Sequence, residues 1–292
     1  MNPCPLCNSN SVRSSWLGEI FYEGYVFPYL ECLSCKSLFC DPMPSDEMVN
    51  KIYGTAYQGA LPEDPAENEP GDPVRVIQWL RRQPSAGTFI DYGCRDGMLL
   101  LQAKELKWQA IGIEINSDVA KATEKRIGVP VVQPDSPLLS GQLADVLHLG
   151  DVIEHLTKIE VQMPQILRRI KPGGLLIAQG PLEANNNLFT LAIRGSRLLR
   201  RSKVIRTSPE HVILATSKGQ RSLFSRFGLK EIEYILNEVA WPAPSKIPRR
   251  EELSVRSLTL YTLRRLSQIA TQLHPDSWGN RYFYVGQKSS DD

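Results

Sequence analysis

The stretch that decides the fold runs from Thr88 to Gly97 and reads TFIDYGCRDG. It opens with a short apolar run that ends at glycine, which is typical of a buried strand, and a helical pattern follows over 97–106. A glycine-rich turn between a strand and a helix lets a ligand approach the main chain close to the helix N-terminus. The turn therefore predicts a ligand site that includes Asp91, Gly93 and Gly97.

Apolar runs and helical patterns alternate at short spacing along much of the remaining chain. The runs that indicate further strands cover residues 110–113, 129–132, 145–149, 175–178, 230–236 and 281–287. The helical patterns cover residues 74–82, 117–126, 158–170 and 253–273, with Ser117 as a cap and Pro172-Gly173-Gly174 as a stop. Such alternation indicates stacked βαβ units with right-handed crossovers. The predicted fold class is α/β, with a doubly wound, mostly parallel, Rossmann-like sheet of seven strands.

An acidic residue, Glu114, directly follows the second predicted strand. Ligands of open α/β sheets lie at the carboxyl ends of the strands, and a carboxylate there can accept hydrogen bonds from both hydroxyls of a ribose. The glycine turn alone is a weak signal. Together with Glu114 it favours a cofactor of the nucleotide type.

The N-terminal segment carries two CxxC pairs, which are separated by 24 residues. Their members are Cys4, Cys7, Cys32 and Cys35. Each pair can present two thiolates from a tight turn, and one hairpin fills the spacing between them, so we expect a closed, structural zinc site. Redox pairs or ordinary cysteines are the alternatives. Cys40 and Cys94 are expected to pack as small apolar side chains.

Two further motifs identify a family. Residues 150–156 read GDVIEHL after the fourth strand, and residues 167–175 read LRRIKPGGL before the fifth. With the glycine turn, they resemble the motifs of class I S-adenosylmethionine-dependent methyltransferases, and the resemblance covers residues 74–235. It implies S-adenosylmethionine as the cofactor of this chain.

The resemblance also implies roles for single residues. Asp91 and Gly93 would line the methionine moiety, Glu114 the ribose, and Asp151 the sulfonium end of the pocket. Asp135 would contact the adenine amine, or would instead cap its own loop.

The glycine turn departs from the family pattern DxGCGxG at one position, where Arg95 replaces the middle glycine. Glycine permits close approach and unusual dihedral angles there. Three interpretations stay open. Arg95 points to solvent and leaves the pocket intact, or it caps the carboxylate of the cofactor, or it blocks the site.

A hydroxyl or carbon acid acceptor needs a base, and histidine is the usual choice at neutral pH. His155 lies in the GDVIEHL motif, and His211 lies in a segment that resembles a substrate-pocket motif of the family. Either is a candidate base, with a purely structural hydrogen bond as the alternative. We expect His148 in the core of a strand and His274 at a helix end.

The segment from Phe39 to Ser45, together with the zinc hairpin, is similar to bacterial methyltransferases that act on sugars and other small molecules. The resemblance implies O- or C-methylation of a small-molecule or glycan-type acceptor, with a nucleotide-linked or lipid-linked sugar favoured. One alternative is an RNA base methyltransferase with a zinc ribbon. The other is a non-catalytic module that lost the cofactor because of Arg95.

The predicted domains are a zinc-binding module over 1–60 with a short helix over 46–57, a proline-rich acidic linker over 61–73, and a methyltransferase domain over 74–292 with a helical insertion over 237–280. No signal peptide and no apolar run of membrane-spanning length is present, so the cytoplasm is the expected compartment. The formal net charge of +2 does not indicate a nucleic-acid partner.

Two segments combine cationic and apolar residues. One carries basic side chains without an acid among them, namely Arg194, Arg197, Arg200, Arg201, Lys203 and Arg206. We interpret it as a solvated helix face, or as a cationic wall for an anionic substrate or a membrane surface. Asn185-Asn186-Asn187 either binds a polar substrate or forms a turn. The insertion carries Leu260, Leu263, Leu266, Ile269, Ala270 and Leu273, for which we expect core or lid packing, with a dimer or membrane contact as the alternative.

Overall fold

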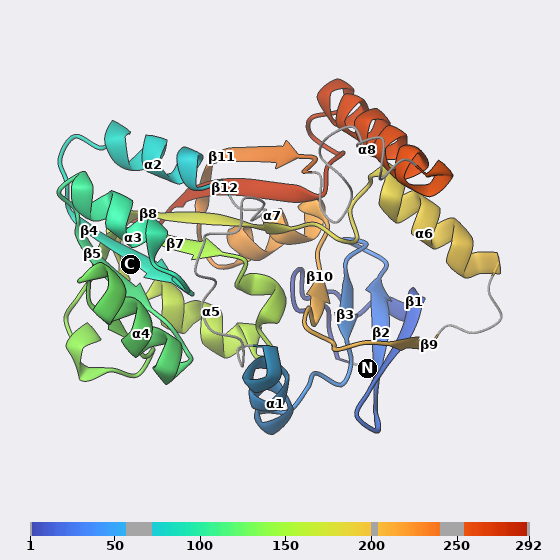
Figure 1. Cartoon of the computed structure of the whole chain (residues 1–292), viewed down its shortest axis with the longest axis horizontal. Coiled ribbons are helices and arrows are strands. Elements are labelled where there is room, and N and C mark those ends of the chain that lie inside the picture. Colours follow the sequence, from blue (N-terminus) through green and yellow to red (C-terminus); the bar gives the residue numbers. More distant parts are fainter. Residues whose placement is uncertain (1, 57–71, 200–203, 240–253, 291–292) are drawn as a thin grey trace. The chain divides into compact units, whose positions relative to one another are not determined.

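The computed structural model describes residues 2–56, 72–199, 204–239 and 254–290 (Figure 1). The chain forms two compact units that interleave along the sequence. Unit 1 consists of Met1–Thr55, Pro181–Leu223 and Ile235–Tyr282. Unit 2 consists of Ala56–Gly180, Phe224–Tyr234 and Phe283–Asp292. The predicted domain division at residues 60 and 74 stays a prediction, and the proposed linker lies outside the described residues except for Asp72 and Pro73.

A seven-stranded sheet in the order β11-β12-β8-β7-β4-β5-β6 confirms the predicted fold class. Its strands are β4 (Thr88–Tyr92), β5 (Gln109–Ile113), β6 (Val131–Val132), β7 (Ala144–Gly150), β8 (Ile170–Pro181), β11 (Lys230–Asn237) and β12 (Arg281–Gln287). The five strands from β4 to β8 pair in parallel. The strand order reverses beside β4, which is where open α/β sheets bind their ligands.

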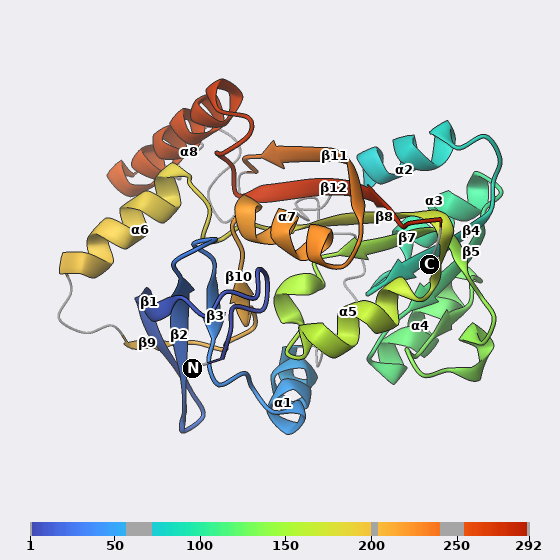
Figure 2. The same ribbon diagram turned by 180° about the vertical axis from the view of Figure 1, so that it is seen from behind.

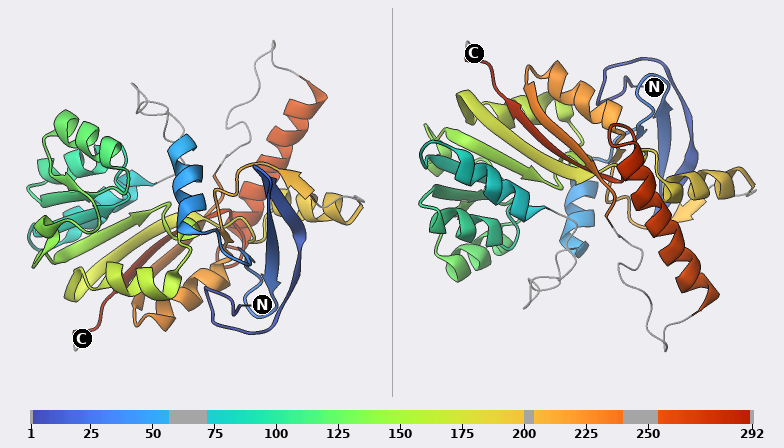
Figure 3. Two further views of the ribbon diagram at one scale, coloured as in Figure 1. Left: turned by 90° about the horizontal axis from the view of Figure 1, so that it is seen from below. Right: turned by 90° about the horizontal axis from the view of Figure 1, so that it is seen from above.

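Helices cover both faces of this sheet, as the βαβ pattern predicts. They are α2 (Pro73–Arg82), α3 (Met98–Glu105), α4 (Ser117–Ile127) and α5 (Ile159–Leu167), with the 3-10 turns η1 (Pro137–Leu139) and η2 (Ile153–His155). Both views of Figure 3 show α2, α3 and α4 on one face and α5 on the other. A further helix is α7 (Ser217–Arg226). In its last turn the ring of Phe224 stacks on the ring of Tyr284 of β12, with ring centroids 3.9 Å apart.

Two local predictions were wrong in detail. The helix expected over 158–170 ends at Leu167, and Pro172-Gly173-Gly174 lies inside β8 rather than stopping the helix. The reason is that the carbonyl of Arg169 already accepts a hydrogen bond from the amide of Ala144, so sheet pairing starts before the proline. Asn116, not Ser117, caps α4, since its side chain accepts from two amides of the first turn.

Unit 1 contains a five-stranded sheet in the order β10-β3-β2-β1-β9 (Figure 2). Its strands are β1 (Val12–Tyr22), β2 (Tyr25–Cys32), β3 (Leu38–Cys40), β9 (Val204–Arg206) and β10 (Ile213–Leu214), and the helix α1 (Asp46–Ala56) follows β3. β1 and β2 form the hairpin expected between the two cysteine pairs. β9 pairs in parallel with β1, and β10 pairs antiparallel with β3, so later parts of the chain cover both edges of the N-terminal strands.

The helices α6 (Leu188–Leu199) and α8 (Val255–Leu273) of unit 1 lie side by side, as Figures 1 and 2 both show. The buried face of α8 is polar and consists of Arg264, Ser267 and Thr271. Of the expected core or lid packing of the apolar residues of the insertion, core packing is therefore wrong for Leu266, Ile269 and Leu273, which are at least half exposed. Among the described residues, no helix has the length and apolar character needed to cross a membrane.

Arg264 organises the contact between these helices. Its side chain forms a buried ion pair with Glu238 and lies 3.9 Å from the centroid of the Phe189 ring of α6. Burial lowers the pKa of Arg264 and raises the pKa of Glu238, because it disfavours the charged form of each group. The attraction between the two charges acts in the opposite direction on both pKa values. The Ser267 hydroxyl adds a contact, since it accepts from the amide of Leu188 at 3.2 Å.

We predict that Arg264→Met destabilises the protein by about 3–5 kcal/mol, because Glu238 then stays buried without its countercharge. The double variant Arg264→Met/Glu238→Gln should recover most of this loss, since it removes both charges. Urea unfolding measures both changes. Arg265→Met, at an exposed neighbour, should change the free energy of unfolding by less than about 0.5 kcal/mol. A double variant as unstable as Arg264→Met would contradict this account.

Candidate functional site

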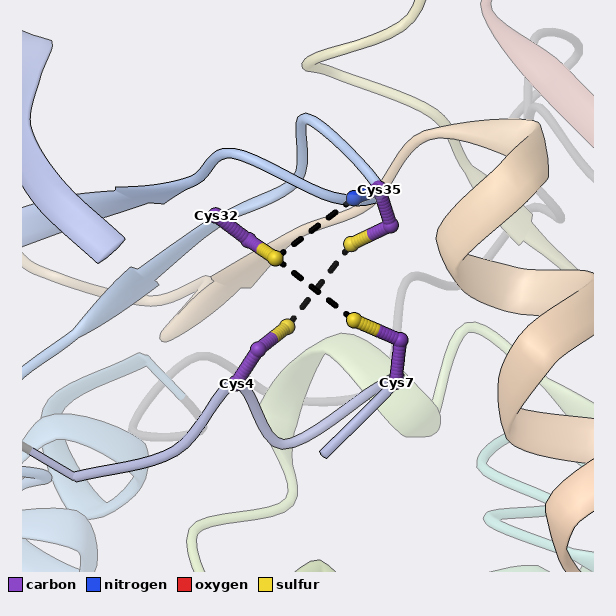
Figure 4. Close-up of side chains that lie close together, drawn as sticks. All are labelled: Cys4, Cys7, Cys32 and Cys35. Atoms are coloured by element: carbon purple, nitrogen blue, oxygen red, sulfur yellow. Dashed lines mark hydrogen bonds between the residues drawn. The ribbon is translucent and has the colours of Figure 1, made fainter. Parts of the chain in front are cut away.

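The four predicted zinc ligands lie together in unit 1 (Figure 4). The Sγ atoms of Cys4 and Cys35 are 3.7 Å apart, and those of Cys7 and Cys32 are 3.5 Å apart. A tetrahedral site with Zn–S bonds of about 2.3 Å requires sulfur atoms about 3.8 Å apart. All four cysteines are free thiols. The donor set and its spacing therefore fit one zinc ion.

Both cysteine pairs use the same backbone turn. The amide of Asn8 donates to the carbonyl of Cys4 at 2.8 Å, and the amide of Lys36 donates to the carbonyl of Cys32 at 2.9 Å. Asn8 and Lys36 each directly follow the second cysteine of a pair and have φ of 57° and 66°. Left-handed residues at matching positions aim both pairs of sulfur atoms at one point. Hydrogen bonding to Cys4 lowers the pKa of Cys35 to about 5, against the effect of burial.

The start of α7 supports the second cysteine pair. Thr216 donates its hydroxyl to the carbonyl of Cys35 at 2.6 Å, and its amide donates to the Ser37 hydroxyl at 3.0 Å. A Cβ on Gly219 would lie 2.2 Å from that hydroxyl oxygen, so only glycine fits. These contacts join residues about 180 positions apart in the sequence, so a local sequence motif does not predict them.

The predicted cofactor turn lies at the carboxyl end of β4 in unit 2. Gly93, Arg95 and Gly97 have φ of 82°, 48° and 69°. Arg95 thus takes the left-handed conformation that costs other residues about 1 kcal/mol and that glycine adopts freely. Its amide donates to Glu114 at 3.2 Å, its carbonyl accepts from the Thr123 hydroxyl at 2.6 Å, and its side chain is exposed. The main chain of the turn therefore keeps a glycine-like form.

Glu114 follows β5, as predicted, and only 3% of its surface is exposed. Its two carboxylate oxygens accept from the amides of Arg95 and Asn116 at 3.2 and 3.1 Å. A carboxylate has about four acceptor sites, so two amide donors leave capacity for ribose hydroxyls. The acceptor chemistry of this edge fits the adenosyl part of S-adenosylmethionine.

Asp91 is connected to a buried polar network. Its Oδ1 lies 2.7 Å from Nδ1 of His148, and Nε2 of His148 lies 3.1 Å from the amide nitrogen of Gln179. The Gln179 oxygen accepts from the amide of Asp72 at the start of α2. His148 is thus a buried strand residue, as expected, and it orients the carboxylate of Asp91.

Asp151 and Asp135 lie at the ends of two other strands. Asp151 directly follows β7 with φ of 51°, and its amide donates to Gln179. Asp135 is exposed and lines a cavity of about 500 Å³ with Tyr92 and Arg169. Ser136, rather than Asp135, caps the following turn. The cavity includes neither the glycine turn nor Glu114.

The two candidate bases belong to different units: His155 lies in unit 2 and His211 in unit 1. His155 is half-buried at the end of η2 in unit 2. In unit 1, Nδ1 of His211 lies 2.7 Å from Oε2 of Glu183. The Tyr29 hydroxyl donates to the carbonyl of His211 at 2.7 Å, and burial raises the pKa of Tyr29, which keeps this donor protonated. The sequence analysis did not identify Glu183. Its position two residues after the end of β8, where a parallel strand leaves the sheet, could have indicated a functional carboxylate.

The basic segment from Arg194 to Arg206 and the triple asparagine segment over 185–187 both make contacts within the fold. Arg194 donates to the carbonyl of Ala184 and lies over the Trp16 ring, and Arg206 lies over the Phe21 ring. Arg200, Arg201 and Lys203 lie outside the described residues. Asn185 donates to Gly279, and Asn187 accepts from the amide of Thr190 at the start of α6. The triple asparagine segment is therefore a structural turn.

Comparison with known proteins gives one family match and several relatives. The family described as a methyltransferase domain matches residues 67–234. The ribosomal protein L11 methyltransferase of Janthinobacterium sp. (strain Marseille) is 33% identical over 116 residues, which are 36% of each chain. The ubiquinone biosynthesis O-methyltransferase of Brucella ovis is 25% identical over 177 residues, which are 53% of this chain and 70% of that protein.

The match to the L11 methyltransferase thus spans 36% of the length of that relative. Among solved structures, a SAM-dependent methyltransferase from Archaeoglobus fulgidus is 18% identical with a TM-score of 0.42, over 75% of this chain and 95% of that chain.

We predict one zinc ion per purified chain, measured by mass spectrometry of the metal. Cys35→Ser should lose the zinc and lower the melting temperature by about 10 °C or more, because a small thiolate site contributes directly to folding. Cys40→Ser is the matched control, since Cys40 is buried but outside the cluster. A Cys35→Ser protein that retains zinc would show that the four thiolates do not form the site.

Proposed function

The chain belongs to the methyltransferase-domain family, and on this premise we propose that it transfers a methyl group from S-adenosylmethionine to a small-molecule or glycan-type acceptor. The observation that carries the proposal is the 2.7 Å contact between Nδ1 of His211 and Glu183. A base of this kind suits an acceptor that must lose a proton, such as a hydroxyl or a carbon acid. O- or C-methylation is therefore favoured.

The residues proposed for the cofactor come from the carboxyl ends of β4 to β7. Asp91 and Gly93 would hold the methionine moiety, with Gly97 closing the turn, Glu114 would hold the ribose and Asp135 the adenine. Asp151 would lie beside the reactive sulfur. When bound, S-adenosylmethionine supplies an electrophilic methyl group on a positively charged sulfur. The chain's own task is to orient the acceptor and to exclude water.

We assign Arg95 to the interpretation in which its side chain points to solvent. Its exposed side chain and the two main-chain contacts support this choice, because neither contact requires the arginine side chain. The alternatives, in which Arg95 caps the cofactor or blocks the site, are outcomes of the binding experiment below.

Glu183 acts as a positioning residue for the base. An ionised carboxylate only accepts hydrogen bonds, so Nδ1 of His211 carries the proton and Nε2 is the basic nitrogen. Nε2 would take the acceptor proton as the methyl group is transferred, and Glu183 would stabilise the resulting imidazolium. His155 is the second candidate for this role.

The favoured acceptor is a nucleotide-linked or lipid-linked sugar. The relative from Brucella ovis, which by name is an O-methyltransferase, supports a small acceptor, and it matches more of this chain than the L11 methyltransferase does. A protein or RNA acceptor is the competing outcome. We propose the cytoplasm as the compartment, because thiolate zinc ligands need reduced cysteines.

Calorimetric titration with S-adenosylhomocysteine tests the cofactor site. The native protein should bind at one site, Arg95→Gly should change the affinity by less than about threefold, and Glu114→Gln should weaken it by about tenfold or more through loss of a charged acceptor. Glu105→Gln, at an exposed carboxylate of α3, is the control. Binding by Arg95→Gly alone would favour the non-catalytic alternative.

Release of S-adenosylhomocysteine tests the base, with nucleotide-linked sugars, phenols, RNA and ribosomal protein as separate acceptor pools. His211→Asn should reduce kcat by about 100-fold, and added imidazole should restore part of it, because general bases contribute rates of this order. Glu183→Gln should lower kcat more than it changes KM.

His274→Asn, at an exposed histidine that ends α8, should leave the rate unchanged. Turnover with RNA or ribosomal protein alone would overturn the proposed acceptor class. Full activity of His211→Asn would transfer the role of base to His155.

A further inference from the structure

The outward face of α8 is apolar. Five large apolar side chains lie on it, with exposed fractions of 87% for Val255, 50% for Leu258, 51% for Leu266, 51% for Ile269 and 72% for Leu273. Their spacing of three, eight, three and four residues places them on one side of a helix. We call these five residues the outer face of α8.

The opposite side of the same helix is polar and buried, and its polar groups already have partners. Arg264 pairs with Glu238, the Ser267 hydroxyl accepts from the amide of Leu188, and the Thr271 hydroxyl donates to the carbonyl of Ser267. The helix is therefore inverted relative to an ordinary surface helix, which buries its apolar stripe. Exposed apolar surface on a folded protein marks an interaction site when it forms a patch, and Leu266, Ile269 and Leu273 follow one another directly on this side of α8.

The neighbouring helix α6 packs along α8 within unit 1 (Figures 1 and 2). Its exposed large apolar residues, Leu191 and Ile193, are two positions apart and therefore point to opposite sides of α6. The outer face is thus defined by the residues of α8 alone.

Charge decides which partner fits the outer face. The sequence contains no Asp or Glu between residues 254 and 275, and none between residues 184 and 209. Exposed Arg256 and Arg265 flank the apolar residues of α8. Within the described residues of α8, a second copy of the chain would bring arginines against arginines, because residues 254–275 contain no carboxylate. An anionic surface complements the arginines while the apolar side chains leave water.

We propose that the outer face of α8 docks on an anionic lipid surface. Arginine side chains extend toward charged headgroups while their aliphatic parts and the leucines enter the boundary between headgroups and acyl chains. This inference goes beyond the proposed methyl transfer and does not depend on it, because it uses neither the cofactor site nor His211.

Co-sedimentation of the full zinc-loaded chain with vesicles tests the proposal. The native protein should bind vesicles that contain phosphatidylglycerol and should not bind phosphatidylcholine alone, and added salt should weaken the binding. Leu266→Ser/Ile269→Ser should reduce binding by about tenfold or more, since it removes apolar contact at the centre of the face. Arg256→Gln/Arg265→Gln should also weaken binding and reduce its dependence on salt.

Val161→Ser is the matched control, because Val161 of α5 is 54% exposed but lies outside α6 and α8. Its binding should equal that of the native protein. Thermal melting verifies that each variant is folded, and the four substituted positions of α8 are exposed.

Absence of binding to any vesicle overturns the proposal. Equal binding to both kinds of vesicle overturns the anionic specificity. Sedimentation velocity adds a further test: a dimer that dissociates in the Leu266→Ser/Ile269→Ser variant, without vesicle binding by the native protein, would assign the face to a second copy of the chain.

Discussion

The parallel pairing of β4 with both β5 and β7 is the constraint on which the candidate cofactor site depends. Tyr92, the last residue of β4, lies opposite Ile113 of β5 and Leu149 of β7, so three strands end at the same edge of the sheet. The chain leaves each strand there, and the departing segments carry the glycine turn, Glu114 and Asp151. A slip of one residue would turn the side chains of β4 to the opposite face, and Asp91 would lose His148.

Both candidate ligand sites use left-handed residues other than glycine. Asn8 and Lys36 complete the cysteine turns, and Arg95 and Asp151 lie at the carboxyl edge of the parallel sheet. Such conformations persist only where the surrounding structure holds them, and they cluster at functional sites. Here main-chain hydrogen bonds hold both residues at the sheet edge, since Arg95 contacts Glu114 and the amide of Asp151 donates to Gln179. Four of the six described non-glycine residues with positive φ thus lie at the two candidate sites, and the other two, Glu23 and Lys107, lie in a hairpin turn and after α3.

Unit 1 shows how short strands are held at the edges of a small sheet. β3, β9 and β10 are only two or three residues long, whereas β1 and β2 have 11 and 8 residues. The four thiolates, the contact of Thr216 with Cys35, and the buried Arg264–Glu238 pair add polar interactions to the buried apolar side chains of this unit.

The sequence by itself determined the features that depend on local spacing. The CxxC pairs predicted the thiolate cluster, the alternation of apolar runs and helical patterns predicted the parallel sheet, and the segment TFIDYGCRDG predicted the strand and turn of β4. Hydrophobic periodicity and the residue preferences of turns depend on neighbouring residues, so a short stretch of sequence is enough to recognise them. The end of α5 was misjudged because a pairing with β7 overrode the local helical pattern.

Only the tertiary structure decided which distant side chains meet. Glu183 orients His211 across 28 positions, His148 joins Asp91 across 57 positions, and Thr216 supports Cys35 across 181 positions. Tertiary packing also chose which face of α8 is buried, because Glu238 lies outside the helix and draws Arg264 inward. Such pairings depend on how strands and helices are packed rather than on the order of neighbouring residues, and for this physical reason no sequence motif contains them.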